Sequence, residues 1–195
     1  MLSVHNNNKT TITMIDLNNT NWKNIESGLS KYLHIMHLFM DTNVQTNSEF
    51  QRLFNGFYKI RQRPKEFYQA LYDYLEQNKN KKASFAQTLS FFYEKLNRFE
   101  PSFSSKIVAT INPGYPVWDS VVLKRLNLKS PVYSSNRDIR LNKMNQIYED
   151  IINWYSIFLT TEEAEKMLIT FDAKMGSVNI SDIKKIDLIL WQTRS

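Results

Sequence analysis

The chain contains no cysteine among its 195 residues, and this absence excludes several kinds of chemistry. Disulfide bonds, thiolate nucleophiles, cysteine-ligated zinc sites and iron–sulfur clusters all require that side chain. The three histidines all lie within the first 37 residues, which disfavours a Ser-His-Asp triad. His34 and His37 are one helical turn apart and could form a metal pair, but a half-exposed helix face is the simpler interpretation. We therefore predict neither a metal site nor a cofactor.

Glycine and proline are also scarce, with four and five copies. Few chain breakers favour long regular elements, and no strand-like alternation extends beyond a few residues. No apolar run approaches the ~20 residues that a membrane-spanning helix needs. Residues 1–14 lack the continuous apolar stretch of a secretory signal. We expect a cytoplasmic protein without a membrane partner. Glycine-rich phosphate loops, nucleophile elbows and His-Glu-x-x-His zinc motifs are missing as well.

What remains is a succession of amphipathic helices that begins at residue 21. Apolar residues recur every three or four positions, and Ser48, Ser84, Ser102 and Ser181 are suitable capping residues. In the longest helix, which follows residue 136, the predicted buried stripe consists of Met144, Ile147, Ile151, Trp154 and Phe158. We predict an all-α fold of about eight or nine helices. Residues 21–195 form a single domain in this prediction, and the polar segment 1–20 is poorly ordered or lies at an edge.

The net charge is +6, and it is distributed unevenly. Residues 1–129 contain 17 Lys and Arg against 10 Asp and Glu, whereas residues 130–195 contain 8 against 9. A basic N-terminal two-thirds suits a polyanionic partner such as nucleic acid. The cluster KIRQRPK places four cations across a turn between two predicted helices. These cations would either clamp phosphate groups or form a solvated connector.

The stretch PGYPVWDSVV at residues 113–122 combines a tight turn with the start of a helix. Asp119 precedes the first predicted helical residue, and Asp is among the best N-cap residues. Lys106 lies near the start of the preceding predicted helix, where the helix dipole would lower the pKa of its amine. From the residues alone, these two side chains are either a cap and an exposed first-turn lysine, or parts of one reactive site. Trp118 is either a core residue or part of the same site.

The segment PGYPVWDSVVLKRLNL resembles a catalytic segment of the helix-hairpin-helix DNA glycosylase superfamily. That segment runs proline, apolar, Asp, small polar, two apolar positions and then a basic helix ending in Leu-x-Leu. The upstream segment SFSSKIVATI resembles the helix that carries the lysine nucleophile of 8-oxoguanine-type members. This resemblance covers about residues 102–128. A broader resemblance, over roughly residues 48–192, is to small bacterial proteins of unassigned role that are related to 8-oxoguanine glycosylases.

The resemblance implies a DNA-glycosylase-like helical domain that excises a damaged base from double-stranded DNA. Asp119 would be the catalytic carboxylate and Lys106 the nucleophile, while Trp118 or Tyr115 would stack on the base or wedge the duplex. The DNA phosphates would be contacted by Lys59, Arg61, Arg63, Lys65, Lys124 and Arg125.

The hairpin motif of the superfamily, Leu-x-Gly-x-Gly, is missing before Lys106, where the chain reads EPSFSS. Those glycines allow backbone amides to approach a DNA phosphate. Their absence favours an alternative hypothesis, in which the same fold serves as a catalytically inactive nucleic-acid-binding or protein-interaction module.

Overall fold

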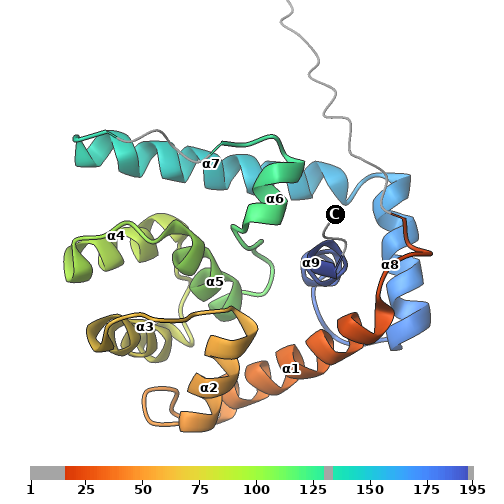
Figure 1. Ribbon diagram of the computed structural model, residues 1–195, viewed down its shortest axis with the longest axis horizontal. Coiled ribbons are helices and arrows are strands. Elements are labelled where there is room, and N and C mark those ends of the chain that lie inside the picture. The colour runs from red at the N-terminus through yellow and green to blue at the C-terminus, as the bar shows by residue number, and fades with distance from the viewer. Residues whose placement is uncertain (1–15, 130–133, 193–195) are drawn as a thin grey trace, which may run out of the picture.

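The computed structural model describes residues 16–129 and 134–192, apart from the side chain of Arg125. Within these ranges the chain forms nine α-helices and no strand, which confirms the predicted all-α fold (Figure 1). The prediction of a poorly ordered segment falls mainly on residues 1–15, outside the described ranges. The helices are α1 (Trp22–Asp41), α2 (Ser48–Phe57), α3 (Lys65–Asn78), α4 (Phe85–Leu96), α5 (Pro101–Ile111), α6 (Ser120–Arg125), α7 (Arg137–Phe158), α8 (Glu162–Met175) and α9 (Asp182–Gln192).

Polar side chains determine most of the helix starts, although two starts differ from the prediction. Ser84 caps α4 as predicted, but Asn47 rather than Ser48 caps α2. Helix α5 begins at Pro101 without a side-chain cap, and Ser102 lies inside it. Proline suits the first helical position because its fixed φ is helical and its missing N–H has no partner there. Lys106 consequently lies in the second turn of α5, not in the first.

The interior contains two hydrophobic clusters, both of which include residues of α1, α4 and α5. One cluster gathers around α7, α8 and α9, and the other joins aromatic side chains of α2, α3 and α4. The buried stripe of α7 is Met144, Tyr148, Ile151, Tyr155 and Phe158.

Of the residues predicted for the buried stripe of α7, Ile147 and Trp154 are only half-buried. The prediction favoured them because they are apolar, whereas Tyr148 and Tyr155 are buried with hydrogen bonds on their hydroxyl groups. Tyrosine takes such core positions when its O–H finds a partner.

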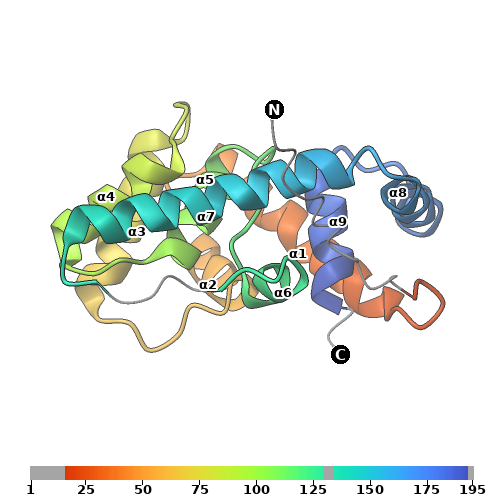
Figure 2. The same ribbon diagram turned by 90° about the horizontal axis from the view of Figure 1, so that it is seen from above.

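Helix α9 lies against the preceding helix α8 and against α1 and α6, which are distant from it in the sequence. Helix α7 runs over α4 along the length of the molecule (Figure 2). Phe57 of α2 and Trp191 of α9 pack against both hydrophobic clusters, with their ring centres 5.6 Å apart. No helix in the described ranges is long and apolar enough to cross a membrane.

Candidate functional site

The turn at residues 113–116 is anchored by side chains of two helices that lie far away in the sequence. The Ser181 hydroxyl, at the start of α9, donates a hydrogen bond to the Pro113 carbonyl at 2.6 Å. The Tyr148 hydroxyl of α7 donates to the Pro116 carbonyl at 2.9 Å. These two bonds fix both ends of the turn. Helices α7 and α9 thereby help to position Asp119, which lies shortly after Pro116 in the chain.

A third anchor connects the same segment to α5. The buried Ser105 hydroxyl accepts a hydrogen bond from the Trp118 amide at 2.9 Å and donates to the Ser102 carbonyl at 3.0 Å. Ser105→Ala would leave the Trp118 N–H buried without an acceptor. We expect the free energy of unfolding to fall by about 1–3 kcal/mol, as measured by urea denaturation.

The neighbouring serine provides a matched control for this prediction. Ser104 is equally buried, but its hydroxyl oxygen has no hydrogen-bond partner in the described structure. Ser104→Ala should therefore leave stability unchanged or increase it. Equal losses in the two variants would show that the Ser105 hydroxyl does not hold the turn.

Asp119 is half-buried and caps α6, as predicted from the sequence. Its Oδ1 accepts hydrogen bonds from the amides of Val121 at 2.7 Å and Val122 at 3.3 Å. Its Oδ2 has no hydrogen-bond partner within the described residues. The two carboxylate oxygens thus differ, since one is engaged by the helix and the other is available to a further partner.

The cap can be separated from the charge by two substitutions at this position. Asparagine caps a helix about as well as aspartate, whereas alanine does not. Asp119→Ala should lower the free energy of unfolding by about 1 kcal/mol, and Asp119→Asn by a few tenths. Thermal unfolding of both variants checks this expectation. Equal destabilisation would indicate that the negative charge, rather than the cap, supports α6.

Lys106 is mostly buried on α5. Its Nζ donates to the Ser102 hydroxyl at 3.1 Å and lies 4.9 Å from the centre of the Phe103 ring. Burial lowers the pKa of the amine from 10.5 to about 8, the carboxylate of Asp119 opposes this shift, and nearby cations reinforce it. The predicted direction is confirmed, but its cause is burial and not the helix dipole. Lys106 and Asp119 therefore influence each other electrostatically, but no ion pair joins them in the described structure.

The KIRQRPK cluster divides into exposed cations and one structural arginine. Lys59, Arg61 and Lys65 are exposed. Arg63 forms an ion pair with the buried Glu100 at 3.3 Å, and its guanidinium lies 4.7 Å from the centre of the Phe103 ring. Arg63 thus has partners within the protein, whereas the other three cations are exposed to solvent.

The remaining predicted DNA contacts are spread between the core and the surface. Trp118 is 4% exposed and stacks on Phe85 with 9° between the ring planes. Its indole belongs to the core and cannot stack on a base unless that core opens, which agrees with the alternative of a core residue. Tyr115 is half-buried and Lys124 is exposed, while the side chain of Arg125 lies outside the described structure.

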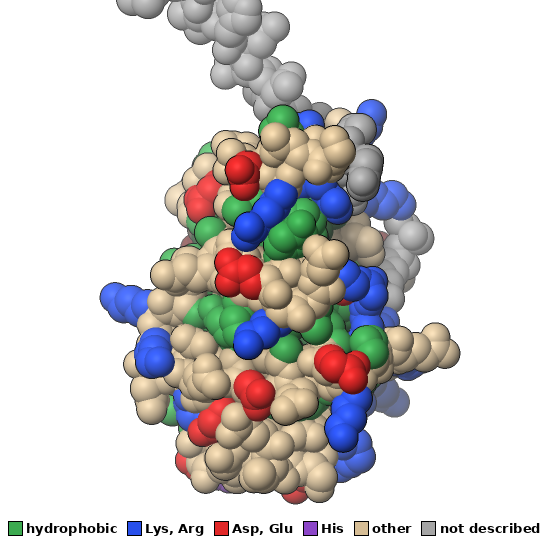
Figure 3. Space-filling view, turned by 90° about the vertical axis from the view of Figure 1, so that its left-hand side faces the viewer, with side chains coloured by type: hydrophobic (Ala, Val, Ile, Leu, Met, Phe, Trp, Pro, Cys, Tyr) green, Lys and Arg blue, Asp and Glu red, His purple; other side chains and the backbone are tan. Residues whose placement is uncertain are grey.

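Charges of both signs are mixed on the face formed by the ends of α3, α4 and α7 (Figure 3). Cations and carboxylates alternate there, so this face does not present a basic surface of the kind that attracts DNA. Within the described residues, no group of three His, Asp or Glu side chains is placed to hold a metal ion.

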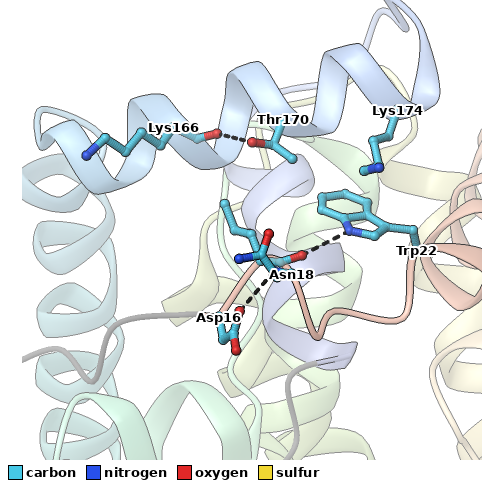
Figure 4. A pocket seen from close by; sticks show the side chains of 7 residues that line it. Asp16, Asn18, Trp22, Lys166, Thr170 and Lys174 are labelled. Carbon is cyan, nitrogen blue, oxygen red and sulfur yellow. Dashed lines mark hydrogen bonds between the residues drawn. The ribbon is translucent and has the colours of Figure 1, made fainter.

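Two pockets on the described surface are lined by neither Lys106 nor Asp119. A pocket of about 680 Å³ lies between residues 16–18 and α8 (Figure 4), where the Trp22 indole donates to the Leu17 carbonyl at 3.2 Å. None of the predicted site residues lines it. The other, of about 550 Å³, lies between α1, α2 and α9 and includes Lys59.

Sequence reasoning missed the side chains that position the candidate site. Ser105 and Tyr148 contact the turn through the fold, and neither is near it in the sequence. The only local signal was the pair of serines in the otherwise apolar face of α5. Comparison with known protein families, with curated proteins and with solved structures found no match.

Proposed function

We propose that this protein is a DNA-repair glycosylase that removes a damaged base and uses Lys106 as its nucleophile. The proposal is supported most by the half-buried position of Lys106 on α5, since burial lowers the pKa of its amine to about 8, and by the electrostatic influence of Asp119. An ordinary lysine is almost fully protonated at neutral pH and has no free electron pair. An amine whose pKa is lowered by burial is partly neutral there and can attack a sugar carbon.

In this mechanism the damaged nucleotide leaves the base stack before it reacts. The neutral Lys106 amine attacks the anomeric carbon, and the base departs with the electrons of the glycosidic bond. Loss of a proton from nitrogen and opening of the sugar ring then give a Schiff base. The carboxylate of Asp119 stabilises the positive charge that develops on the sugar. Its Oδ2 would do so while Oδ1 continues to cap α6.

A second candidate function is nucleic-acid binding without catalysis. It is favoured by the partners that occupy Arg63 and by the burial of Trp118 in the core. It is also favoured by the lining of both described pockets, which includes neither Lys106 nor Asp119. This alternative predicts duplex binding that weakens steeply with salt, because each phosphate contact releases counterions, and no base release.

Reductive trapping distinguishes the two functions. The protein is incubated with cyanoborohydride and duplexes that contain 8-oxoguanine or an abasic site, and an undamaged duplex serves as the control. We expect a covalent adduct with the damaged duplexes, which peptide mass spectrometry assigns to Lys106. Salt-dependent binding with neither adduct nor base release would support the alternative. An adduct only at other amines would contradict the role of Lys106.

The rate of adduct formation should depend on pH in a way that reports the Lys106 amine. Only the neutral amine reacts, so the rate should rise about tenfold per pH unit below the pKa and level off above it. With a pKa of about 8, the rate of adduct formation should level off above about pH 8. Single-turnover trapping on an abasic duplex measures the profile. A midpoint near 10.5, the ordinary value, would contradict a buried nucleophile.

A further inference from the structure

The pocket between α1, α2 and α9 has the dimensions of a small-molecule site. Helix α1 contributes Gly28 and Lys31, α2 contributes Arg52 and Gly56, and α9 contributes Trp191. Its volume of about 550 Å³ falls within the range of ~300–1,000 Å³ that is typical of ligand pockets. Helix α1 contacts both other helices, so the walls are held together by the packing of the fold.

The charge on the walls is of one sign. The ionisable residues of the lining are Lys31, Arg52 and Lys59, and no carboxylate is among the lining residues. None of the three cations forms an ion pair within the described structure. All three side chains are exposed, and their combined positive charge would attract an anion to the pocket.

Two of the four glycines of the chain line this pocket. Gly28 lies inside α1, where glycine is less favourable than alanine by about 1 kcal/mol, and Gly56 lies in the last turn of α2. A Cβ on Gly56 would meet no atom within 4 Å, and one on Gly28 would lie 3.5 Å from Leu188. Close packing therefore does not require glycine at position 56. The missing side chain instead leaves space for a ligand.

Trp191 provides an aromatic surface and an unused hydrogen-bond donor. Its Nε1 is buried and has no acceptor in the described structure. Its ring and that of Phe57, which also lines the pocket, meet at 61°. A planar apolar ring would pack well against these side chains.

We propose that this pocket binds a nucleotide, that is, a planar aromatic ring that carries at least one phosphate group. The phosphate would lie against Arg52 and Lys31, since guanidinium and ammonium groups bind phosphate oxygens. The ring would lie against Trp191 and Phe57. The same chemistry is offered by a free nucleotide and by one nucleotide of a strand. The proposal does not depend on Lys106 or Asp119.

Calorimetric titration of the full chain tests the proposal with separate ligands. Adenosine and guanosine monophosphates are compared with inorganic phosphate, with adenosine and with a single-stranded oligonucleotide. We expect the monophosphates to bind at least about tenfold more tightly than phosphate or adenosine alone. If only the oligonucleotide binds, and Gly56→Leu abolishes that binding, the ligand is a nucleotide within a strand. Absence of binding in every arm overturns the proposal.

Variants of the walls assign the binding to this pocket. Gly56→Leu should abolish binding and still fold, because leucine favours helix and its Cβ meets no neighbour. Arg52→Gln and Lys31→Gln should each weaken binding about tenfold. Lys23→Gln removes an exposed cation of α1 outside the pocket and should have no effect. If the Gly56→Leu variant still binds the nucleotide, the assignment of the binding site to this pocket is overturned. Lys106→Met should not alter binding, which separates this site from the proposed catalytic one.

Discussion

Lys106→Met should lower the rate of adduct formation on an abasic duplex by on the order of 10²-fold or more. Methionine has a similar length and retains the apolar stem, but it lacks the amine that forms the Schiff base. The rate is measured by single-turnover trapping with cyanoborohydride. Lys124→Met serves as the control, because Lys124 is an exposed lysine shortly after Asp119 and should be dispensable for the covalent step.

The same variant should not lose stability at neutral pH. In the folded protein the pKa of Lys106 is lowered from 10.5 to about 8, so folding disfavours its protonated form. This cost is present below pH 8 and disappears as the pH rises towards 10.5. The wild-type protein should therefore gain stability relative to Lys106→Met across that window.

If a stable Lys106→Met protein still forms the covalent adduct at the wild-type rate, that result would contradict the proposed mechanism.

Asp187→Ala should reduce the free energy of unfolding by about 3–5 kcal/mol. Asp187 and Lys184 of α9 are both fully buried, and their Oδ2 and Nζ atoms lie 3.3 Å apart. The Tyr155 hydroxyl donates to the other carboxylate oxygen at 2.5 Å. Removing the carboxylate would leave the Lys184 ammonium in the interior without its counterion. Urea denaturation measures the loss.

A double variant shows whether the loss comes from the unpaired charge. Lys184→Met combined with Asp187→Leu replaces the ion pair by apolar groups of similar size, which is often neutral or stabilising. The double variant should therefore be clearly more stable than Asp187→Ala. A double-mutant cycle gives the coupling energy of the pair. A loss in Asp187→Ala of only a few tenths of a kcal/mol would indicate that water reaches Lys184.

The sequence was sufficient to predict the features that depend on neighbouring residues. Helix periodicity and capping side chains are local, so the all-α fold and the caps formed by Ser84 and Asp119 were predicted correctly. The cap of α2 was assigned to Ser48 instead of Asn47, and Ser102 was assigned as the cap of α5, which begins at Pro101 without a side-chain cap. Asn47 and Ser48 are both good capping residues, and only backbone conformation decides between them.

Features that depend on distant contacts could not be read from the sequence. The buried face of α7 includes Tyr148 and Tyr155 because Pro116 and Asp187 accept their hydrogen bonds, 32 residues away in each case. Burial of Lys106 likewise results from packing and not from its place in α5. In general, the elements of the candidate site were predictable, whereas the positions of their side chains were not.

The central position of α9 also affects how the chain folds as it is synthesised. Helices α1, α6 and α8 all leave the ribosome before α9, which lies against each of them. Until α9 emerges, the apolar faces that it covers remain open, and the two hydrophobic clusters lack Trp191 between them. The nascent chain therefore cannot complete its core until α9 has emerged.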